Sequence, residues 1–387
     1  MNEYIKNLVE KLKDEVISYR RWFHENPELS EKEYMTKNKI IEFLNENNIQ
    51  YRLVLETGIH AYIENKKGLS LAYRADMDAL PIKEENDLEY ISKNVGVMHA
   101  CGHDVHLAVQ LGLIKALNES KDKWHGTVNF FFQPAEETVG GAKRMLECGV
   151  NNPKNDALFS FHSAPEILAG KVGIKYGKMH ATSAVFKLEI IGKEAHAALA
   201  YKGVDAISIS AKVIEYLSYI VSRKLDARNS GVITVGKING GTAENIVANK
   251  VELTGTIRTL DKKTKEYIVS ILNNELKDFV KSFNANLNVF IRDSYVPVIN
   301  DKEFTDFLKE NAVDILGEDN VIEINETRMD VEDIGYFLEQ IPGSFYRLGV
   351  SASEKFSDLH TKNLMIDEKA LEVGLMLNIK LALEYLK

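Results

Sequence analysis

The sequence predicts an α/β protein: a mostly parallel sheet with helices on both faces, and a smaller domain inserted into that architecture. Three apolar runs of strand length, at 68–76, 127–133 and 156–162, alternate with helical patterns. Such alternation is typical of a parallel sheet covered by helices. The second observation is a β-α-β-β-α-β order in the middle of the chain, which is typical of a ferredoxin-like unit.

Each helix of the large domain follows from a periodic apolar pattern. Asp104 is placed to cap the helix that starts after it. Pro134 and Pro165 follow two of the strands, where a proline ends the strand ladder. The patterns predict helices at 2–22, 31–47, 105–117, 140–148, 303–316 and 367–386.

The middle of the chain carries its own set of elements. The patterns predict strands at 183–192, 230–238, 250–260 and 285–293, and helices at 203–224 and 264–283. A unit with this order closes on itself, so it can be inserted into another domain. We therefore expect one discontinuous domain, 1–180 with 296–387, and one inserted domain, 181–295.

Composition and charge exclude several classes of protein. The chain has 387 residues and a formal net charge of −9, so its charge gives no basis for binding nucleic acid. No stretch reaches the roughly 18 apolar residues that a membrane helix needs. The pattern at 2–22 is charged throughout, unlike a signal peptide, and we expect a cytoplasmic protein. Cys101 and Cys148 do not make a disulfide framework, and a cysteine among histidines is more typical of a ligand or nucleophile.

Metal-competent side chains follow two neighbouring strands of the predicted sheet. Glu136 and Glu137 come directly after one strand, and His162 ends the next. Sites in open α/β sheets form beyond the carboxyl ends of strands, and the loop "MHACGHDVH" at 98–106 can face the same edge. Adjacent glutamates fit one metal ligand and one general base of a hydrolytic two-metal site. Taken singly, each of these signals is weak, and spacing alone leaves the ligand set incomplete.

Seven motifs in order resemble the M20 metallopeptidase family, in particular its amidohydrolase branch of aminoacylases, hippurate hydrolases, auxin-conjugate hydrolases and N-acetyldiaminopimelate deacetylases. The resemblance covers nearly the whole chain. It implies that the inserted domain is a lid and dimerisation domain. The motifs are "YRADMDALP", "MHACGHDVH", "FQPAEE", "FHSAP", "GKEAHAA", "GTAENIVANKVELTGTIRTLD" and "DLHTKNLMIDEKAL".

The resemblance also implies the composition of the site. Two divalent metal ions, zinc or manganese, would be held by five ligands, with Cys101 bridging them. Glu136 would be the general base, and Asp76 and Asp78 would orient ligands. His99 and His106 are not required as ligands. The implied ligands are Cys101, His103, Glu137, His162 and His360.

Further site residues are implied in the inserted domain. His196 would stabilise the oxyanion of the tetrahedral intermediate, reaching across a dimer. Asn245 and Arg258 would anchor the substrate carboxylate, for which an arginine fork is well suited. The lid motif departs from the family's His-Gly-Ala-x-Pro-His, because Ala197, Ala200 and Tyr201 replace its Gly, Pro and second His. In the large domain, the segment 329–337 is expected to line the substrate pocket.

The sequence therefore predicts a metal-dependent amidohydrolase that cleaves the amide bond of N-acyl amino acids, such as N-acetyl amino acids, and releases a carboxylate and a free amino acid. Its partners would be this small-molecule substrate and further copies of the chain, as a homodimer or higher homo-oligomer, with no nucleic acid and no membrane. The alternatives are a dipeptidase or carboxypeptidase, an N-acetyldiaminopimelate deacetylase of lysine biosynthesis, and a non-enzymatic zinc-binding protein.

Overall fold

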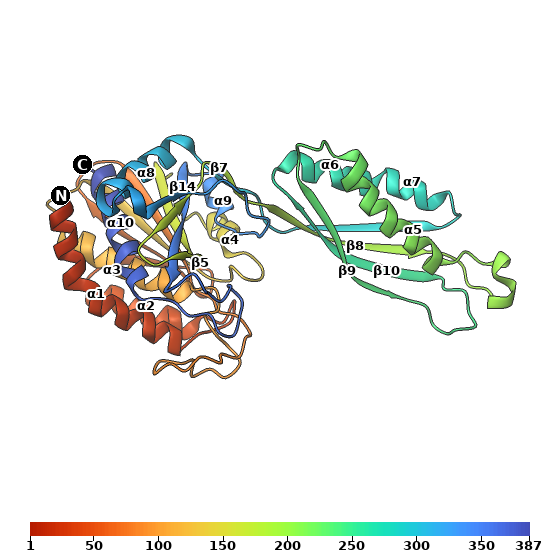
Figure 1. Ribbon diagram of the computed structural model, residues 1–387, viewed down its shortest axis with the longest axis horizontal. Helices are drawn as coiled ribbons and strands as arrows, with labels where there is room; N and C mark the ends of the chain where they lie inside the picture. The colour runs from red at the N-terminus through yellow and green to blue at the C-terminus, as the bar shows by residue number, and fades with distance from the viewer. The chain divides into compact units, whose positions relative to one another are not determined.

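The computed structural model describes all 387 residues and divides them into two compact units (Figure 1). The first unit consists of Met1–Gly177, Ile299–Glu326 and Asp333–Lys387. The second consists of Lys178–Val298 and Thr327–Glu332. None of the helices in either unit is both long enough and apolar enough to cross a membrane.

The first unit is built on an eight-stranded sheet in the order β1-β2-β4-β3-β5-β14-β6-β13. Its centre is parallel, because β3 pairs in parallel with β4 and β5, and β5 pairs in parallel with β14. The prediction of an α/β fold with a mainly parallel sheet is therefore confirmed. The strands are β1 Gln50–Val54, β2 Gly58–Asn65, β3 Ser70–Asp76, β4 Gly126–Gln133, β5 Ala157–Leu168, β6 Val172–Ile174, β13 Val321–Glu323 and β14 Gly343–Ser351.

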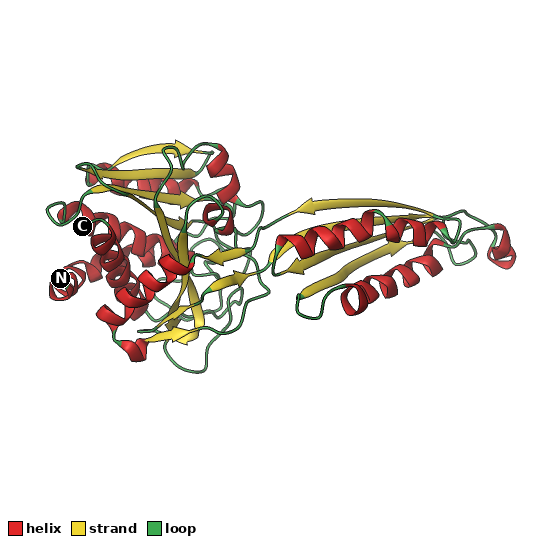
Figure 2. Ribbon diagram, turned by 90° about the horizontal axis from the view of Figure 1, so that it is seen from above, coloured by secondary structure: helices red, strands yellow, loops and turns green.

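Helices pack against this sheet and against one another (Figure 2). Nearly every residue of α3 is buried, and this helix contacts α1, α10 and the strand β3. Such all-round burial explains its apolar sequence, since a helix covered on every side needs no polar face. The helices are α1 Asn2–Glu25, α2 Tyr34–Glu46, α3 His103–Glu119, α4 Gly141–Glu147, α8 Lys302–Leu316, α9 Gly335–Leu338 and α10 Lys369–Tyr385.

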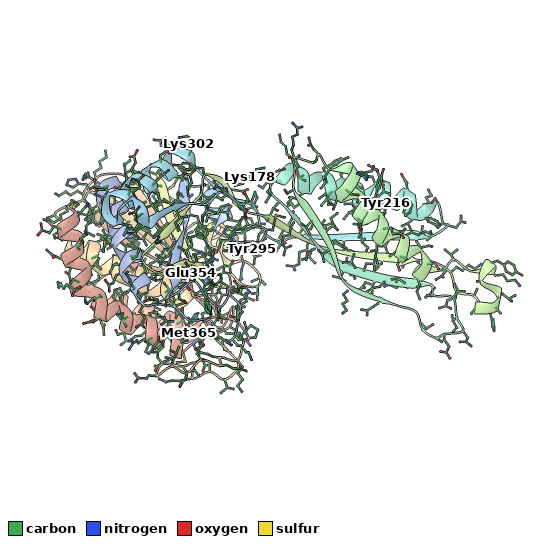
Figure 3. The ribbon with its side chains drawn as sticks, viewed as in Figure 1. Lys178, Tyr216, Tyr295, Lys302, Glu354 and Met365 are labelled. Carbon is green, nitrogen blue, oxygen red and sulfur yellow. The ribbon has the colours of Figure 1, made fainter.

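The second unit has a four-stranded antiparallel sheet in the order β11-β8-β10-β9, with helices on one face (Figure 1). Its core lies between the sheet and the helices. At the edge of this core the partly buried ring of Tyr216, labelled in Figure 3, stacks on Phe279 at 4.8 Å. The helix predicted at 264–283 is two helices, because the backbone of Asn274 is not helical. The elements are β8 Thr182–Ile191, α5 Ala206–Tyr219, β9 Gly231–Gly240, β10 Lys250–Thr259, α6 Lys262–Asn273, α7 Glu275–Lys281 and β11 Asn286–Asp293. The strands β7 Gly177–His180 and β12 Val298–Asn300 form a separate two-stranded sheet.

Candidate metal centre

The five side chains implied as ligands all lie in the first unit, on β5, at the start of α3 and in the segments that follow β4 and β14. His162 belongs to β5, while Glu137 follows β4. Cys101 and His103 flank the start of α3. Gly102 separates them with a φ of +79°, and a Cβ there would lie 2.8 Å from the side chain of Ser163. Only glycine suits this position, so the Cys-Gly-His spacing follows from the turn itself.

The donor atoms converge on Cys101. Its Sγ lies 3.4 Å from Nε2 of His162 and 3.3 Å from Nε2 of His360. Glu137 Oε1 lies 3.3 Å from Nε2 of His360 and 3.9 Å from Nε2 of His103. Cys101 thus belongs to two groups of three donors, each within 4.8 Å: one with His103 and His162, the other with Glu137 and His360. A thiol shared by two donor groups is the arrangement that a bridging ligand requires.

The outward nitrogens of two histidines are held by backbone carbonyls. Nδ1 of His103 donates to the carbonyl oxygen of Asp78 at 2.8 Å, and Nδ1 of His162 donates to that of Ser163 at 2.8 Å. In each ring Nε2 is therefore the atom that faces the centre. This is the orientation commonly found in metal-binding histidines.

Two buried donor atoms lack a hydrogen-bond partner, Nε2 of His103 and Oε1 of Glu137. Buried polar atoms are nearly always hydrogen-bonded, so this pair indicates a site for a bound cation. The charges around His103 also indicate a cation site. Although burial lowers the pKa of His103, Asp76 and Asp78 outweigh that effect and raise it to about 10. The centre therefore carries a surplus of negative charge, which a metal ion would neutralise as it replaces the proton.

Asp76 is hydrogen-bonded to a histidine outside the implied ligand set, His106. Nε2 of His106 accepts a hydrogen bond from the backbone N–H of Ser163 at 3.0 Å, so the ring proton sits on Nδ1 and is donated to Asp76 Oδ1. Asp76, His103 and His106 also form a group of donors within 4.8 Å. Because both nitrogens of His106 are engaged, it serves as a support for Asp76 and not as a metal ligand.

Asp78 accepts hydrogen bonds from the backbone of both adjacent glutamates. Its Oδ1 accepts the backbone N–H of Glu136 at 3.1 Å, and its Oδ2 accepts that of Glu137 at 3.0 Å. Ser30 Oγ donates to Asp78 Oδ2 at 2.6 Å. Before the pair, Ala135 has a φ of +57°, a conformation that costs a non-glycine residue roughly 1–2 kcal/mol. The strained turn lets two consecutive side chains, both with little exposure, serve different purposes.

A buried network supports Asp76 from behind. Arg74 donates to Asp76 Oδ2 at 2.6 Å, to Asp333 Oδ1 at 2.7 Å and to Gln133 Oε1 at 2.8 Å. Asp333 also accepts the backbone N–H of Ala142 at 3.0 Å. The segment 329–337 was expected to line the substrate pocket, and that expectation stays a prediction. The side chain of Asp333 is enclosed in this network, and its carboxylate lies within 4.8 Å of carboxylate atoms of Glu136 and Glu332. The sequence analysis missed Arg74, although a charged residue inside a buried strand pattern was an available signal.

The remaining predicted residues lie in the second unit. His196 caps a short 3₁₀ helix, Ala197–Lys202, and its Nδ1 accepts from the backbone N–H of Ala198 at 3.1 Å. In the neutral ring the proton therefore sits on Nε2. The backbone of His196 bridges to Ile246, which brings it next to Asn245.

Arg258 lies elsewhere in that unit, near the far end of β10. Its Nη1 donates to Ser183 Oγ at 2.6 Å, and partial burial lowers its pKa. It lies eight positions after Lys250, where β10 begins, and that is roughly 26 Å of extended chain. Asn245 precedes Lys250, so one copy of the chain does not bring Asn245 and Arg258 together.

Comparisons with known proteins agree with this geometry. The model of Peptidase family M20/M25/M40 matches residues 72–384, and the chain belongs to this family, as the motifs predicted. It is 38% identical over 371 residues to N-acetyl-L-cysteine deacetylase of Bacillus subtilis, covering 93% of this chain and 85% of that protein. It is 36% identical over 375 residues to N-acetyldiaminopimelate deacetylase of Lactobacillus acidophilus, covering 93% and 95%. The structure of the Bacillus subtilis YxeP protein, a dinuclear metal binding peptidase from the M20 family, matches with a TM-score of 0.85, 30% identity, and coverage of 97% and 99%.

Proposed function

We propose that this chain hydrolyses the amide bond of N-acyl amino acids, N-acetyl amino acids above all, and releases a carboxylate and a free amino acid. The observation that carries the proposal is the convergence of donors on Cys101, where Nε2 of His103 and Oε1 of Glu137 lack a hydrogen-bond partner beside Glu136. The deacetylase names of the relatives support the same reaction and the same class of small-molecule substrate.

Two divalent ions, zinc or manganese, would be held by the five-residue donor set. One thiol with three imidazoles and a carboxylate suits zinc well. When bound, the ions would lower the pKa of a water molecule and polarise the substrate carbonyl. Asp76 and Asp78 would keep the ligands oriented through the contacts described above. The proposed ligands are Cys101, His103, Glu137, His162 and His360.

Glu136 is the proposed general base and then general acid. Its carboxylate lies within 4.8 Å of donor atoms of His103 and Glu137, and Asp78 accepts the backbone N–H groups of both glutamates. It would take a proton from the attacking water and pass that proton to the leaving amine. A base of this kind has to stay off the metal, and the glutamate pair divides those two tasks.

The second unit would complete the site from another copy of the chain. His196 Nε2–H would donate to the oxyanion, because Ala198 holds its Nδ1 as an acceptor. Asn245 and Arg258 would bind the substrate carboxylate, and their separation along β10 supports contributions from two copies. We therefore propose a homodimer or larger homo-oligomer, formed through the second unit. A ligand thiol at Cys101 suits a reducing compartment, and we propose the cytoplasm.

The base assignment is tested with Glu136→Gln. This variant should still bind two metal ions per chain, measured by elemental analysis after gel filtration, while kcat falls by roughly 10²–10⁴-fold. Glu137→Gln is the matched control, because it should lose metal as well as activity. A Glu136→Gln enzyme with wild-type kcat would rule out the assignment.

Ligand roles are tested separately with His360→Ala. One ion should bind more weakly in this variant, since the group of Cys101, Glu137 and His360 loses a donor. Titration of the metal-free protein with Zn²⁺, followed by calorimetry, measures the two affinities. Two tightly bound ions in the variant would contradict the ligand set.

The relatives favour a second candidate substrate, N-acetyldiaminopimelate, and the family name leaves peptides as a third. All three substrates contain an amide beside a carboxylate, so the same centre could act on each. A rate comparison on N-acetyl amino acids, N-acetyldiaminopimelate and dipeptides, with enzyme reconstituted with Zn²⁺ or Mn²⁺, decides among them. The proposed function requires the highest kcat/KM among the N-acetyl amino acids.

A further inference from the structure

We propose that Glu33 is a positioning residue for the proposed general base, holding the turn that presents Glu136. Glu33 lies 103 positions before Glu136 in the sequence and does not touch the donor set. Its effect on turnover rests on the proposed function, whereas its hold on the turn does not.

The carboxylate of Glu33 is fully buried and accepts three hydrogen bonds. Oε1 accepts the backbone N–H of Ala135 at 2.9 Å and that of Glu31 at 3.0 Å. Oε2 accepts the hydroxyl of Thr57 at 2.7 Å. All three partners act as donors, so the side chain acts purely as an acceptor. It joins the start of α2, the turn before β2 and the turn after β4.

The turn needs such a hold because Ala135 adopts a left-handed conformation. At φ +57° an alanine is strained, and strained residues persist only where their surroundings enforce the conformation. Ala135 is completely buried, and its N–H is bonded to Glu33. The next two N–H groups, of Glu136 and Glu137, are bonded to Asp78. Three successive amides therefore end on two buried carboxylates.

Glu33 and Asp78 accept hydrogen bonds from different parts of the turn. Asp78 holds the backbone of a proposed ligand, Glu137, and its own carbonyl oxygen holds His103. In the turn after β4, Glu33 accepts a hydrogen bond only from Ala135, one residue before the proposed base. Loss of Glu33 should therefore move Glu136 and leave the metal ligands in place. Small misplacements of a catalytic group cost large factors in rate, so turnover should fall while metal binding remains.

The test compares Glu33→Ala with Glu33→Gln and a matched control. In Glu33→Ala, hydrogen exchange in peptides covering 133–138 should accelerate at least tenfold, and kcat should fall roughly 10–100-fold. Metal content should stay at the wild-type value and KM within about twofold, because neither the ligands nor the substrate contacts change. Glu33→Gln should stay within about fivefold of wild-type kcat, since its amide oxygen still accepts from Ala135 and its NH₂ can donate to Thr57.

The control is Glu28→Ala. Glu28 lies in the same segment and likewise accepts a backbone N–H and a threonine hydroxyl, but both belong to Thr36. Removal of Glu28 should leave exchange at 133–138 and kcat unchanged. If Glu33→Ala does not fold, Glu33→Asp replaces it: this carboxylate is one methylene shorter, so kcat should fall at least fivefold although the charge is kept.

The inference is overturned if exchange at 133–138 is unchanged in Glu33→Ala, or in Glu33→Asp where that variant replaces it. It is also overturned if the variant loses metal, or if Glu33→Gln is as impaired as Glu33→Ala. A wild-type enzyme that hydrolyses none of the substrates would count against the proposed function alone. In that case the exchange and metal measurements still decide whether Glu33 holds Ala135.

Discussion

Replacement of Arg74 by methionine should destabilise the first unit far more than the loss of its packing would suggest. Arg74, Asp76 and Asp333 are all fully buried, and the guanidinium is bonded to both carboxylates. Methionine fills a similar volume but leaves two buried carboxylates without their shared cation. Removing one partner of a buried ion pair typically costs about 3–5 kcal/mol. For a domain of roughly this size, each kcal/mol lowers Tm by about 2–4 °C.

We therefore expect Arg74→Met to lower Tm by about 6 °C or more, measured by calorimetry on metal-free protein in a chelator. Arg74→Lys is the control, because it keeps the charge and loses only part of the fork, so its loss should be smaller. The loss of Tm in Arg74→Met should also depend on pH. Burial would raise the pKa of Asp76, but Arg74, His103 and His106 together hold it well below its ordinary value. Burial raises the pKa of Asp333 despite Arg74.

Without Arg74, the folded-state pKa of Asp333 should lie further above the unfolded value near 3.9, and that of Asp76 should rise although His103 and His106 still lower it. Each rise destabilises the variant relative to wild type progressively as the pH increases through the range of the shift. The gap in Tm between wild type and Arg74→Met should therefore be smaller at pH 5 than at pH 8. A gap below about 2 °C at pH 8, or one that widens toward pH 5, would refute this reasoning.

Three further predictions concern the supports of the centre. Asp78→Asn should leave the backbone N–H of Glu136 or of Glu137 without its acceptor, which costs about 1–3 kcal/mol. Both metal content and kcat should fall, and an unchanged metal content would contradict the role of Asp78. Burial and the nearby Arg20 lower the pKa of His24. The hydrogen bonds of His24 to Asp104 and Glu84 outweigh both effects and raise this pKa above its ordinary value. The stability that protonated His24 contributes to the fold is therefore complete below about pH 6.5 and is lost as pH rises through the raised pKa. The Tm of wild type should exceed that of His24→Gln by more at pH 6 than at pH 9. Metal removal should lower Tm by several degrees, reversibly on addition of Zn²⁺, and a Tm that ignores a chelator would argue against a bound ion.

Local patterns predicted the parts of the fold whose cause is local. The runs that became β3, β4 and β5 are mostly apolar because these strands lie inside the sheet. Their ends were visible as a switch to polar residues, and this switch located Glu136 and His162, whereas Asp76 came from the family motifs. The ligand set itself came from the family motifs, because spacing did not reveal that His360 would join residues more than 200 positions earlier.

What escaped the sequence analysis depends on contacts between distant segments. The strand β14 was not predicted, since Arg347 and two glycines interrupt its apolar pattern, yet every residue in it is buried. Arg74 is 259 positions from Asp333, and Glu33 is 102 positions from Ala135. No local sequence pattern indicates that either pair of residues will be in contact. The ring nitrogen that carries the proton in neutral His106 and His196 is likewise set by the folded backbone, and no sequence pattern indicates it.

The position of β14 has a consequence for the growing polypeptide. In the finished sheet β14 lies between β5 and β6, but it is translated about 175 residues after β5. At roughly 5–20 residues per second, the outer edge of β5 waits about 9–35 s on the ribosome for its partner. The second unit, nearly all of which is the continuous stretch Lys178–Val298, can fold during that interval. An unpaired edge of an apolar strand attracts other chains, so β5 is where a nascent copy of this protein most needs a chaperone.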